Sequence, residues 1–218
     1  ANCNTCSTTV IVQDTSSPVV ICKIDTVQLD ALGNAIVLAS NINDGSTDNC
    51  SSPSLSINGG LSTTVTCANL GSNSVTLTAT DPSGNSSSCL TTVIVEDLTA
   101  PNASCNASVT VILDASSNGT LTPAEVDLGS SDNCTLATLT LSKTSFNCGD
   151  IPGNPHTITM LATDQSSNLD SCTVQVSVLD TVDPVALCIP GTLNLSLIGS
   201  TVSTTVAAVN NGSTDNCA

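Results

Sequence analysis

The strongest constraint on this chain is an internal repeat of 83 residues. Four landmarks recur at that interval, two cysteines, an aspartate and a proline: Cys6, Cys89 and Cys172; Asp14, Asp97 and Asp180; Pro18, Pro101 and Pro184; Cys22, Cys105 and Cys188. A fixed period of this length indicates one repeated structural module. The landmarks divide the chain into a terminal strand (1–18), two full repeats (19–101 and 102–184) and a segment that carries only the first strands of another repeat (185–218).

Apolar and polar residues alternate within each repeat, as in "TTVIVED" (91–97) and "CTVQVSVLD" (172–180). This alternation predicts β-strands. In the first repeat we expect strands at 19–28, 34–40, 53–57, 62–67, 74–80 and 89–96. About seven short strands in roughly 80 residues are typical of an immunoglobulin-like β-sandwich. The sequence therefore predicts an all-β fold of tandem sandwiches, joined like beads on a string by stiff Asp-x-x-x-Pro linkers.

Cysteines take the place of aromatic residues in this composition. The chain has twelve Cys, one Phe, and no Tyr or Trp. Such a small-residue core needs support, and many cysteines in small domains indicate disulfides and an extracellular location. Because the first and last strands of a sandwich lie close together, we expect two pairs that join them and two that close short middle loops: Cys22–Cys89, Cys105–Cys172, Cys50–Cys67 and Cys134–Cys148.

Four cysteines remain without a partner in a complete repeat. The period assigns Cys6 to Cys188, which leaves Cys3 for Cys217. If these bonds join two molecules, residues 1–18 of one molecule complete the 185–218 segment of the next, and a head-to-tail filament results. The open alternative is that the sequence is a window of a longer tandem array. A zinc site at the Cys3-x-x-Cys6 pair is a weaker alternative, because no second pair lies at zinc spacing.

Acidic residues dominate the charge, with 18 Asp and Glu against two Lys, for a net charge of −16. This excess argues against nucleic acids and anionic membranes as partners and favours cations or neutral glycans. No apolar run is long enough to span a membrane. The sandwich order brings aspartates together at three junctions, where we expect calcium sites at Asp14, Asp44, Asp48 and Asp81; at Asp97, Asp127, Asp132 and Asp164; and at Asp180, Asp183 and Asp215. The alternative is that these aspartates only cap turns.

The sequence signals for glycosylation and for catalysis are weaker. N-glycosylation sequons occur at Asn49, Asn85, Asn102, Asn106, Asn118, Asn133, Asn194 and Asn211. The single histidine, His156, lies in a Pro- and Gly-rich turn, and no G-x-S-x-G surrounds a serine. We therefore expect no enzyme activity and no required cofactor.

The stretch "ATDPSGNSSSCLTTVIVEDLTAPNASC" (79–105) and the two "STDNC" strings resemble hyalin-repeat (HYR-like) domains. Cysteine-rich domains of this kind recur in large surface adhesins of Bacteroidota-type bacteria. This chain departs from them at Val75 and Leu77, where aromatic residues are common. The resemblance implies tandem immunoglobulin-like domains at a cell surface and O-glycosylation of Asp-Thr-Val sites, here Thr26 and Thr181.

Two functions from different classes follow. The first is a structural protein that forms a filament, a stalk or the fibre of a biofilm matrix by associating with itself. The second is the repeat region of a cell-adhesion protein that binds glycans or surfaces, with or without calcium.

Overall fold

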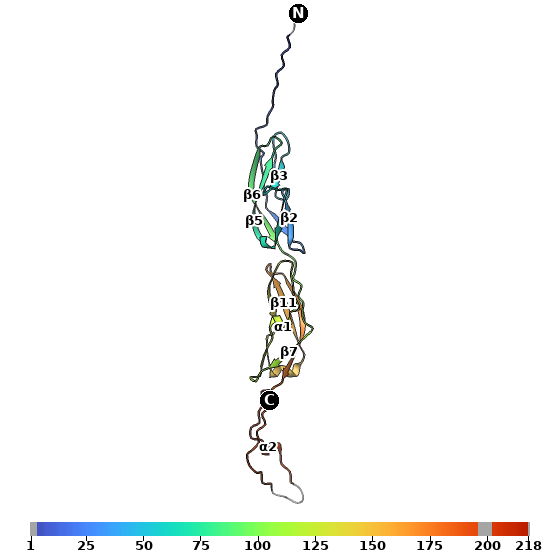
Figure 1. Cartoon of the computed structure of the whole chain (residues 1–218), viewed down its shortest axis with the longest axis vertical. Coiled ribbons are helices and arrows are strands. Elements are labelled where there is room, and N and C mark those ends of the chain that lie inside the picture. Colours follow the sequence, from blue (N-terminus) through green and yellow to red (C-terminus); the bar gives the residue numbers. More distant parts are fainter. Residues whose placement is uncertain (1–3, 196–201, 218) are drawn as a thin grey trace. The chain divides into compact units, whose positions relative to one another are not determined.

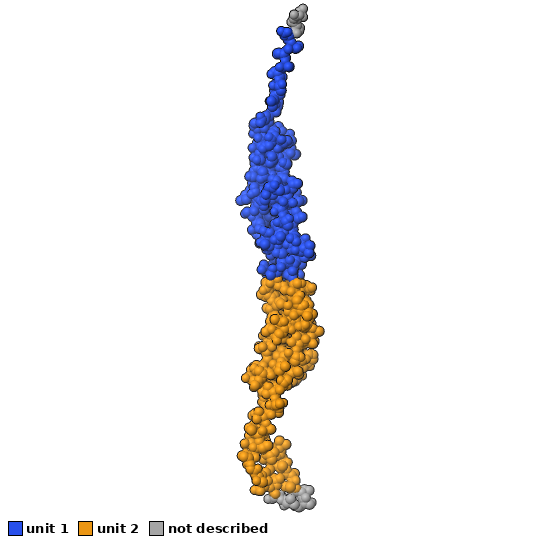
Figure 2. All heavy atoms as spheres, viewed as in Figure 1, with its two compact units in different colours: residues 1–100, 132–135, 164–168 blue, residues 101–131, 136–163, 169–218 orange. Residues whose placement is uncertain are grey.

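The computed structural model describes residues 4–195 and 202–217, and these form two compact units (Figure 2). Unit 1 contains the chain up to residue 100 together with residues 132–135 and 164–168. Unit 2 contains residues 101–131, residues 136–163 and the chain from residue 169 onward. The elements of both units are mostly strands, so the fold is all-β as predicted (Figure 1).

Unit 1 is a sandwich of a four-stranded and a two-stranded sheet. The larger sheet has the order β1 (Asp25–Gln28), β6 (Ser86–Glu96), β5 (Gly71–Thr80), β3 (Ser54–Ile57). In it β1 runs parallel to β6, and the other pairs are antiparallel. The smaller sheet pairs β2 (Asn34–Leu38) with β4 (Ser62–Thr66), and the 3₁₀ helix η1 (Cys67–Asn69) follows β4.

The core of unit 1 fills the space between these sheets. Alternate residues of each strand point inward, which buries Val37 of the small sheet against Leu77, Val93 and Val95 of the large one. Val, Leu and Ile supply most of this core, as the composition predicted.

Unit 2 repeats this topology. Its larger sheet has the order β7 (Ser108–Leu113), β12 (Leu169–Asp180), β11 (His156–Asp164), β9 (Leu136–Leu141), and its smaller sheet pairs β8 (Asn118–Thr120) with β10 (Ser145–Asn147). The 3₁₀ helix η2 (Cys148–Gly153) follows β10, and two one-turn helices, α1 (Pro123–Val126) and α2 (Val206–Val209), complete the elements. The chain's one Phe, Phe146, is buried in this core. The shared topology confirms tandem, disulfide-linked immunoglobulin-like sandwiches.

The predicted strands of the first repeat match the observed ones to within a few residues, except the first. Of residues 19–28, the last four form β1, while Val19 and Cys22 make isolated pairings with Thr47 and Asn43. From Asp25 onward the chain pairs with β6 instead. Residues 185–214 begin in the same way, with isolated pairings of Val185 with Thr214 and of Cys188 with Asn210.

Disulfides Cys22–Cys89 and Cys105–Cys172 form as expected, and each joins the segment just before the first strand, β1 or β7, to the last strand, β6 or β12. The two short-loop pairs were wrong. The structure instead bonds Cys67 to Cys134, and Cys148 to Cys217. Both bonds therefore connect one sequence repeat with the segment that follows it.

Cys50 and Cys67 do not pair because they lie at opposite ends of unit 1. Cys67 follows β4 at the end where β5 begins, whereas Cys50 lies beside Asp14, in the same aspartate group as Asp81 just after β5. The ten residues of β5 span roughly 30 Å, and a disulfide needs Cα atoms within about 7 Å. Cys134 and Cys148 occupy the equivalent positions in the next repeat and are likewise bonded elsewhere.

The expected bond between Cys3 and Cys217 was also wrong, because Cys217 is bonded to Cys148. Cys3 itself, and with it the Cys3-x-x-Cys6 zinc alternative, lies outside the described residues.

Candidate functional site

Three aspartates of unit 1 meet in one cluster. Asp97 directly follows β6, Asp164 ends β11, and Asp132 lies in the turn that contains Asn133 and Cys134. Each aspartate offers a carboxylate oxygen, and these oxygens lie within 4.8 Å of one another. We call Asp97, Asp132 and Asp164 the Asp97 cluster.

Local hydrogen bonds hold each carboxylate in place. The backbone N–H groups of Thr99, Cys134 and Asn168 donate to Asp97, Asp132 and Asp164 at 3.1, 3.0 and 2.7 Å. These are turn-capping contacts of the kind aspartate commonly makes. They occupy Oδ1 of Asp97 and Oδ2 of Asp132, and leave the other oxygen of each group free for another partner.

Two asparagine amides complete the surroundings of the cluster. Nδ2 of Asn168 donates to Oδ2 of Asp164 (2.7 Å) and to the backbone carbonyl of Asp97 (3.0 Å). Nδ2 of Asn133 donates to Oδ1 of Asp97 (3.2 Å) and to the carbonyl of Asp30 (3.0 Å). Neither asparagine was predicted to belong to the site, although Asn168 ends the stretch "ATDQSSN" (162–168), which repeats the pattern of "ATDPSGN" (79–85).

The cluster contains buried oxygens without a hydrogen-bond donor. These are Oδ2 of Asp97, Oδ1 of Asp132 and Oδ1 of Asn133. The side chains of Asp97 and Asp164 are almost fully buried, with 3% and 2% of their surface exposed. Buried polar atoms of native proteins are rarely left unpaired, so each such atom needs a physical explanation.

A second cluster repeats the arrangement at Asp14, Asp48 and Asp81 of unit 1, again with oxygens within 4.8 Å. Nδ2 of Asn85 donates to Oδ2 of Asp81 and to the carbonyl of Asp14, as Asn168 does in the Asp97 cluster. The backbone N–H of Ser16 and the thiol of Cys50 lower the pKa of Asp14. That hydrogen bond, followed by burial and the nearby carboxylates, raises the pKa of Cys50.

Other predicted ligands lie apart from these clusters. Asp44 and Asp183 are exposed. Asp127 caps a turn, where the side chain and then the backbone N–H of Ser130 lower its pKa. The prediction that Asp44 and Asp127 belong to the aspartate clusters was wrong. The side chain that caps this turn comes from Asn43, Asp127 and Asn210 in the three copies. Asp127 is therefore used as a cap, and Asp44 lies one residue beyond the capping position.

The third expected site is only partly assembled in unit 2. Asn216 donates to Oδ1 of Asp180 (3.1 Å), and Asp215 lies next to it in the same turn. Oδ1 of Asp215 and Oδ1 of Asn216 are buried without partners, as in the Asp97 cluster.

Residues 4–17 form a further candidate site of a different kind. Val10 and Val12 are 79% and 92% exposed. By the period they correspond to Val93 and Val95 in β6 and to Val176 and Val178 in β12, all of which are at most 2% exposed. The segment thus has the sequence of a core strand, but it pairs with no strand in the part of the chain that the structure describes.

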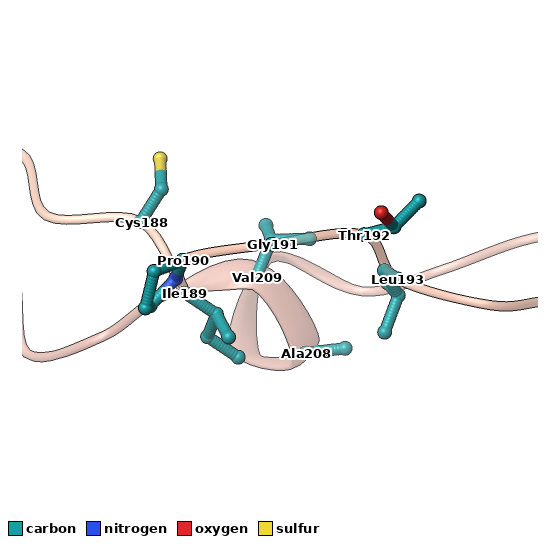
Figure 3. A pocket seen from close by; sticks show the side chains of 8 residues that line it. All are labelled: Cys188, Ile189, Pro190, Gly191, Thr192, Leu193, Ala208 and Val209. Atoms are coloured by element: carbon teal, nitrogen blue, oxygen red, sulfur yellow. The ribbon is translucent and has the colours of Figure 1, made fainter.

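Cys6 and Cys188 are exposed and form no disulfide within the described part of the chain, and the same holds for Cys50. An apolar hollow of about 270 Å³ lies beside Cys188, lined in part by Ile189, Leu193 and Val209. Figure 3 shows the Cys188 thiol and the Ile189 side chain on opposite sides of the backbone.

The glycosylation candidates differ in accessibility. Thr26, Thr181, Asn102, Asn118 and Asn194 are exposed, and Asn106 is half-buried with its amide bonded to the carbonyl of Glu125. Asn85 is a poor candidate for glycosylation, because its side-chain amide is already hydrogen-bonded to Asp14 and Asp81 in the second aspartate cluster.

His156 has a structural contact. Its Nε2 lies 2.6 Å from the carbonyl oxygen of Asp150, and its ring packs near Phe146. Among the described residues, no helix has the length and apolar character needed to cross a membrane.

A scan against protein-family models and a search of curated proteins gave no match. Solved structures match weakly. The fibronectin(III)-like modules of Clostridium thermocellum CbhA are 12% identical (TM-score 0.26; 75% of this chain and 94% of that chain). Extracellular cadherin domains 1–4 of protocadherin gamma B7 are 15% identical, with a TM-score of 0.31, over 86% of this chain and 55% of that chain. EC1-4 of Drosophila N-cadherin is 14% identical, with a TM-score of 0.38, over 75% of this chain and 50% of that chain. The chain thus spans about half the length of either cadherin structure. Matches at this level identify neither a family nor a function, and the hyalin-repeat resemblance stays a prediction.

Proposed function

We propose that this chain is an extracellular structural protein whose copies associate head to tail into a filament, stalk or matrix fibre. The observation that carries the proposal is residues 4–17, a core-strand sequence whose valines are exposed while their equivalents in β6 and β12 are buried. Four disulfides support an oxidising location.

The proposed partner of residues 4–17 is the segment around Cys188 in a second copy of this chain. Cys22–Cys89 and Cys105–Cys172 each bond a first-strand cysteine to a last-strand cysteine. In this pattern Cys188 takes the first-strand position and Cys6 the last-strand position, and both are exposed and form no disulfide among the described residues. The exposed side chain of Leu193, which corresponds by the period to Val27 beside the core of unit 1, supplies apolar surface for Val10 and Val12.

The proposed Cys6–Cys188 disulfide has to supply much of the stability of this association. In unit 1, β6 pairs with β1 over four residues and with β5 over ten. The segment around Cys188 corresponds to the β1 side, so an added strand gains one neighbour there. A two-stranded pairing is marginal in water, and a Cys6–Cys188 bond would make the association permanent.

Electrophoresis of the oxidised full chain with and without reductant tests the proposal. We expect a ladder of multimers that collapses on reduction to one band of about the 21.7-kDa subunit. Cys6→Ser and Cys188→Ser should each abolish the ladder. A mixture of these two variants should form a single disulfide-linked dimer, because each retains one half of the bond.

Cys50→Ser is the matched control and should keep the ladder, since Cys50 is also exposed and unpaired. One monomer band in both lanes would overturn head-to-tail bonding. A ladder that survives in Cys6→Ser but disappears in Cys50→Ser would show that Cys50, and not Cys6, forms the bond between copies.

A further inference from the structure

We propose that the Asp97 cluster binds one calcium ion, held by Asp97, Asp132 and Asp164 with the side-chain oxygen of Asn133. This inference is independent of head-to-tail association. The observation that points to a ligand is Asp97, whose side chain is 3% exposed and whose Oδ2 has no hydrogen-bond partner.

The charge of the cluster favours a bound cation. Three carboxylates share a site in which their oxygens lie within 4.8 Å, and two of the three are almost fully buried. Like charges at such separations repel strongly when water is excluded. The ion pair found in the described part of the chain joins Lys143 to Asp150, in unit 2. Among the described residues, no basic side chain forms an ion pair with the Asp97 cluster.

The unpaired atoms match the ligands of a hard cation. Asp97, Asp132 and Asn133 each present one buried oxygen without a donor, and Asp164 retains lone pairs on both oxygens. Calcium accepts several carboxylate and amide oxygens in flexible geometry, whereas magnesium needs near-octahedral geometry and usually keeps several waters. A set of protein oxygens on three separate segments therefore favours calcium.

The fixed oxygens also show that the site is prepared before binding. Backbone N–H groups occupy the opposite oxygen of Asp97 and of Asp132, at 3.1 and 3.0 Å, and so orient the free oxygen. Disulfide Cys67–Cys134 fixes the turn that carries Asp132. The same unpaired atoms recur at Asp215 and Asn216, which argues against an accident of one turn.

Calorimetric titration of the full chain with calcium chloride, after treatment with a chelator, tests the inference. Asp132→Asn should reduce the number of bound calcium ions by one relative to the natural chain. Asp127→Asn is the matched control, since it removes the same charge outside the cluster and Asn43 and Asn210 already make the equivalent turn cap. Its calcium binding should not change, and magnesium should bind more weakly than calcium.

Thermal unfolding of Asp97→Asn gives a second, independent readout. In chelator this variant should melt at or above the natural chain, because an amide removes one repelling charge and can donate to the remaining carboxylates. In excess calcium it should melt below the natural chain, whose melting temperature the ion raises.

Absence of calcium uptake at millimolar concentration overturns the inference, and so does unchanged stoichiometry in Asp132→Asn. An Asp97→Asn variant that is less stable in both conditions to the same extent would show that Asp97 acts only through its hydrogen bonds.

Discussion

At the scale of single residues, Lys143 has several roles in unit 2. Its amine donates to Asp150 and lies 4.9 Å from the ring centroid of Phe146, over the chain's one aromatic side chain. The hydrogen bond from Lys143, together with the backbone N–H of Asn147, lowers the pKa of Asp150 from its ordinary value of 3.8. A carboxyl whose pKa is lowered by folding stabilises the folded state above the unfolded pKa and loses this contribution as the pH falls through the folded one.

We therefore expect Lys143→Gln to lower the free energy of unfolding by about 1 kcal/mol at neutral pH, since the pair is partly exposed. The difference from the natural chain should shrink as the pH falls from 3.8, where Asp150 of the unfolded chain becomes protonated, through the lower pKa of Asp150 in the folded chain. Urea unfolding at a series of pH values measures both. A difference that stays constant with pH would mean that Lys143 acts through packing alone.

The aspartates show how far a sequence can predict a site. Asp97, Asp132 and Asp164 were expected to meet, and they do. Asp127 was expected to join them, but it caps a turn with Ser130. The sequence could not separate these cases, because ligand and cap use the same side chain, and the difference depends on which backbone N–H lies within reach. Asn133 was missed for a similar reason, since it resembled a glycosylation sequon.

At the scale of elements, period-two patterning was enough to place the strands, and unit 1 follows it from β2 to β6. Disulfide pairing was not predictable in the same way. Proximity in sequence favours closing short loops such as 50–67, yet the ten-residue strand β5 separates the two ends of this loop. Cys134, which is far along the sequence, lies beside Cys67 because the turn at Asp132 belongs to unit 1. Pairing depends on tertiary topology, which the period alone did not reveal.

Residues 4–17 allow an element-scale test of the proposed association. Val12→Asp should leave the stability of the isolated chain unchanged within about 0.5 kcal/mol, because Val12 is 92% exposed. It should sharply reduce the multimer ladder, because the equivalent residues Val95 and Val178 are buried and an unpaired charge there is costly. Size-exclusion chromatography and non-reducing electrophoresis measure the two effects.

Ser7→Asp is the control for this test. It adds the same charge to the same segment, but its equivalents Leu90 and Thr173 are exposed in their sheets. The ladder should therefore persist. Equal loss of multimers in both variants would show that charge near Cys6, rather than burial of the strand face, prevents association.

At the scale of the whole molecule, the disulfides form overlapping loops. The four bonds close the loops 22–89, 67–134, 105–172 and 148–217, and each loop opens before the preceding one ends. A force applied to the two ends of the chain therefore passes from loop to loop through covalent bonds. A shortest path of this kind leaves most of the backbone free of tension even after every strand has separated.

Pulling on the chain ends with optical tweezers tests this path. The unfolded, oxidised chain should extend to less than about one third of the reduced length, because the taut path includes few of the residues. Removing Cys148–Cys217 by double Ser substitution should lengthen the unfolded chain by about 25 residues, or roughly 80 Å, since no other bond spans that segment. Removing Cys67–Cys134 should change the length very little, because loops 22–89 and 105–172 provide a route of nearly equal length. Equal extension with and without reductant would contradict the pairing, and a large gain in the second variant would show that loops 22–89 and 105–172 do not bypass the bond.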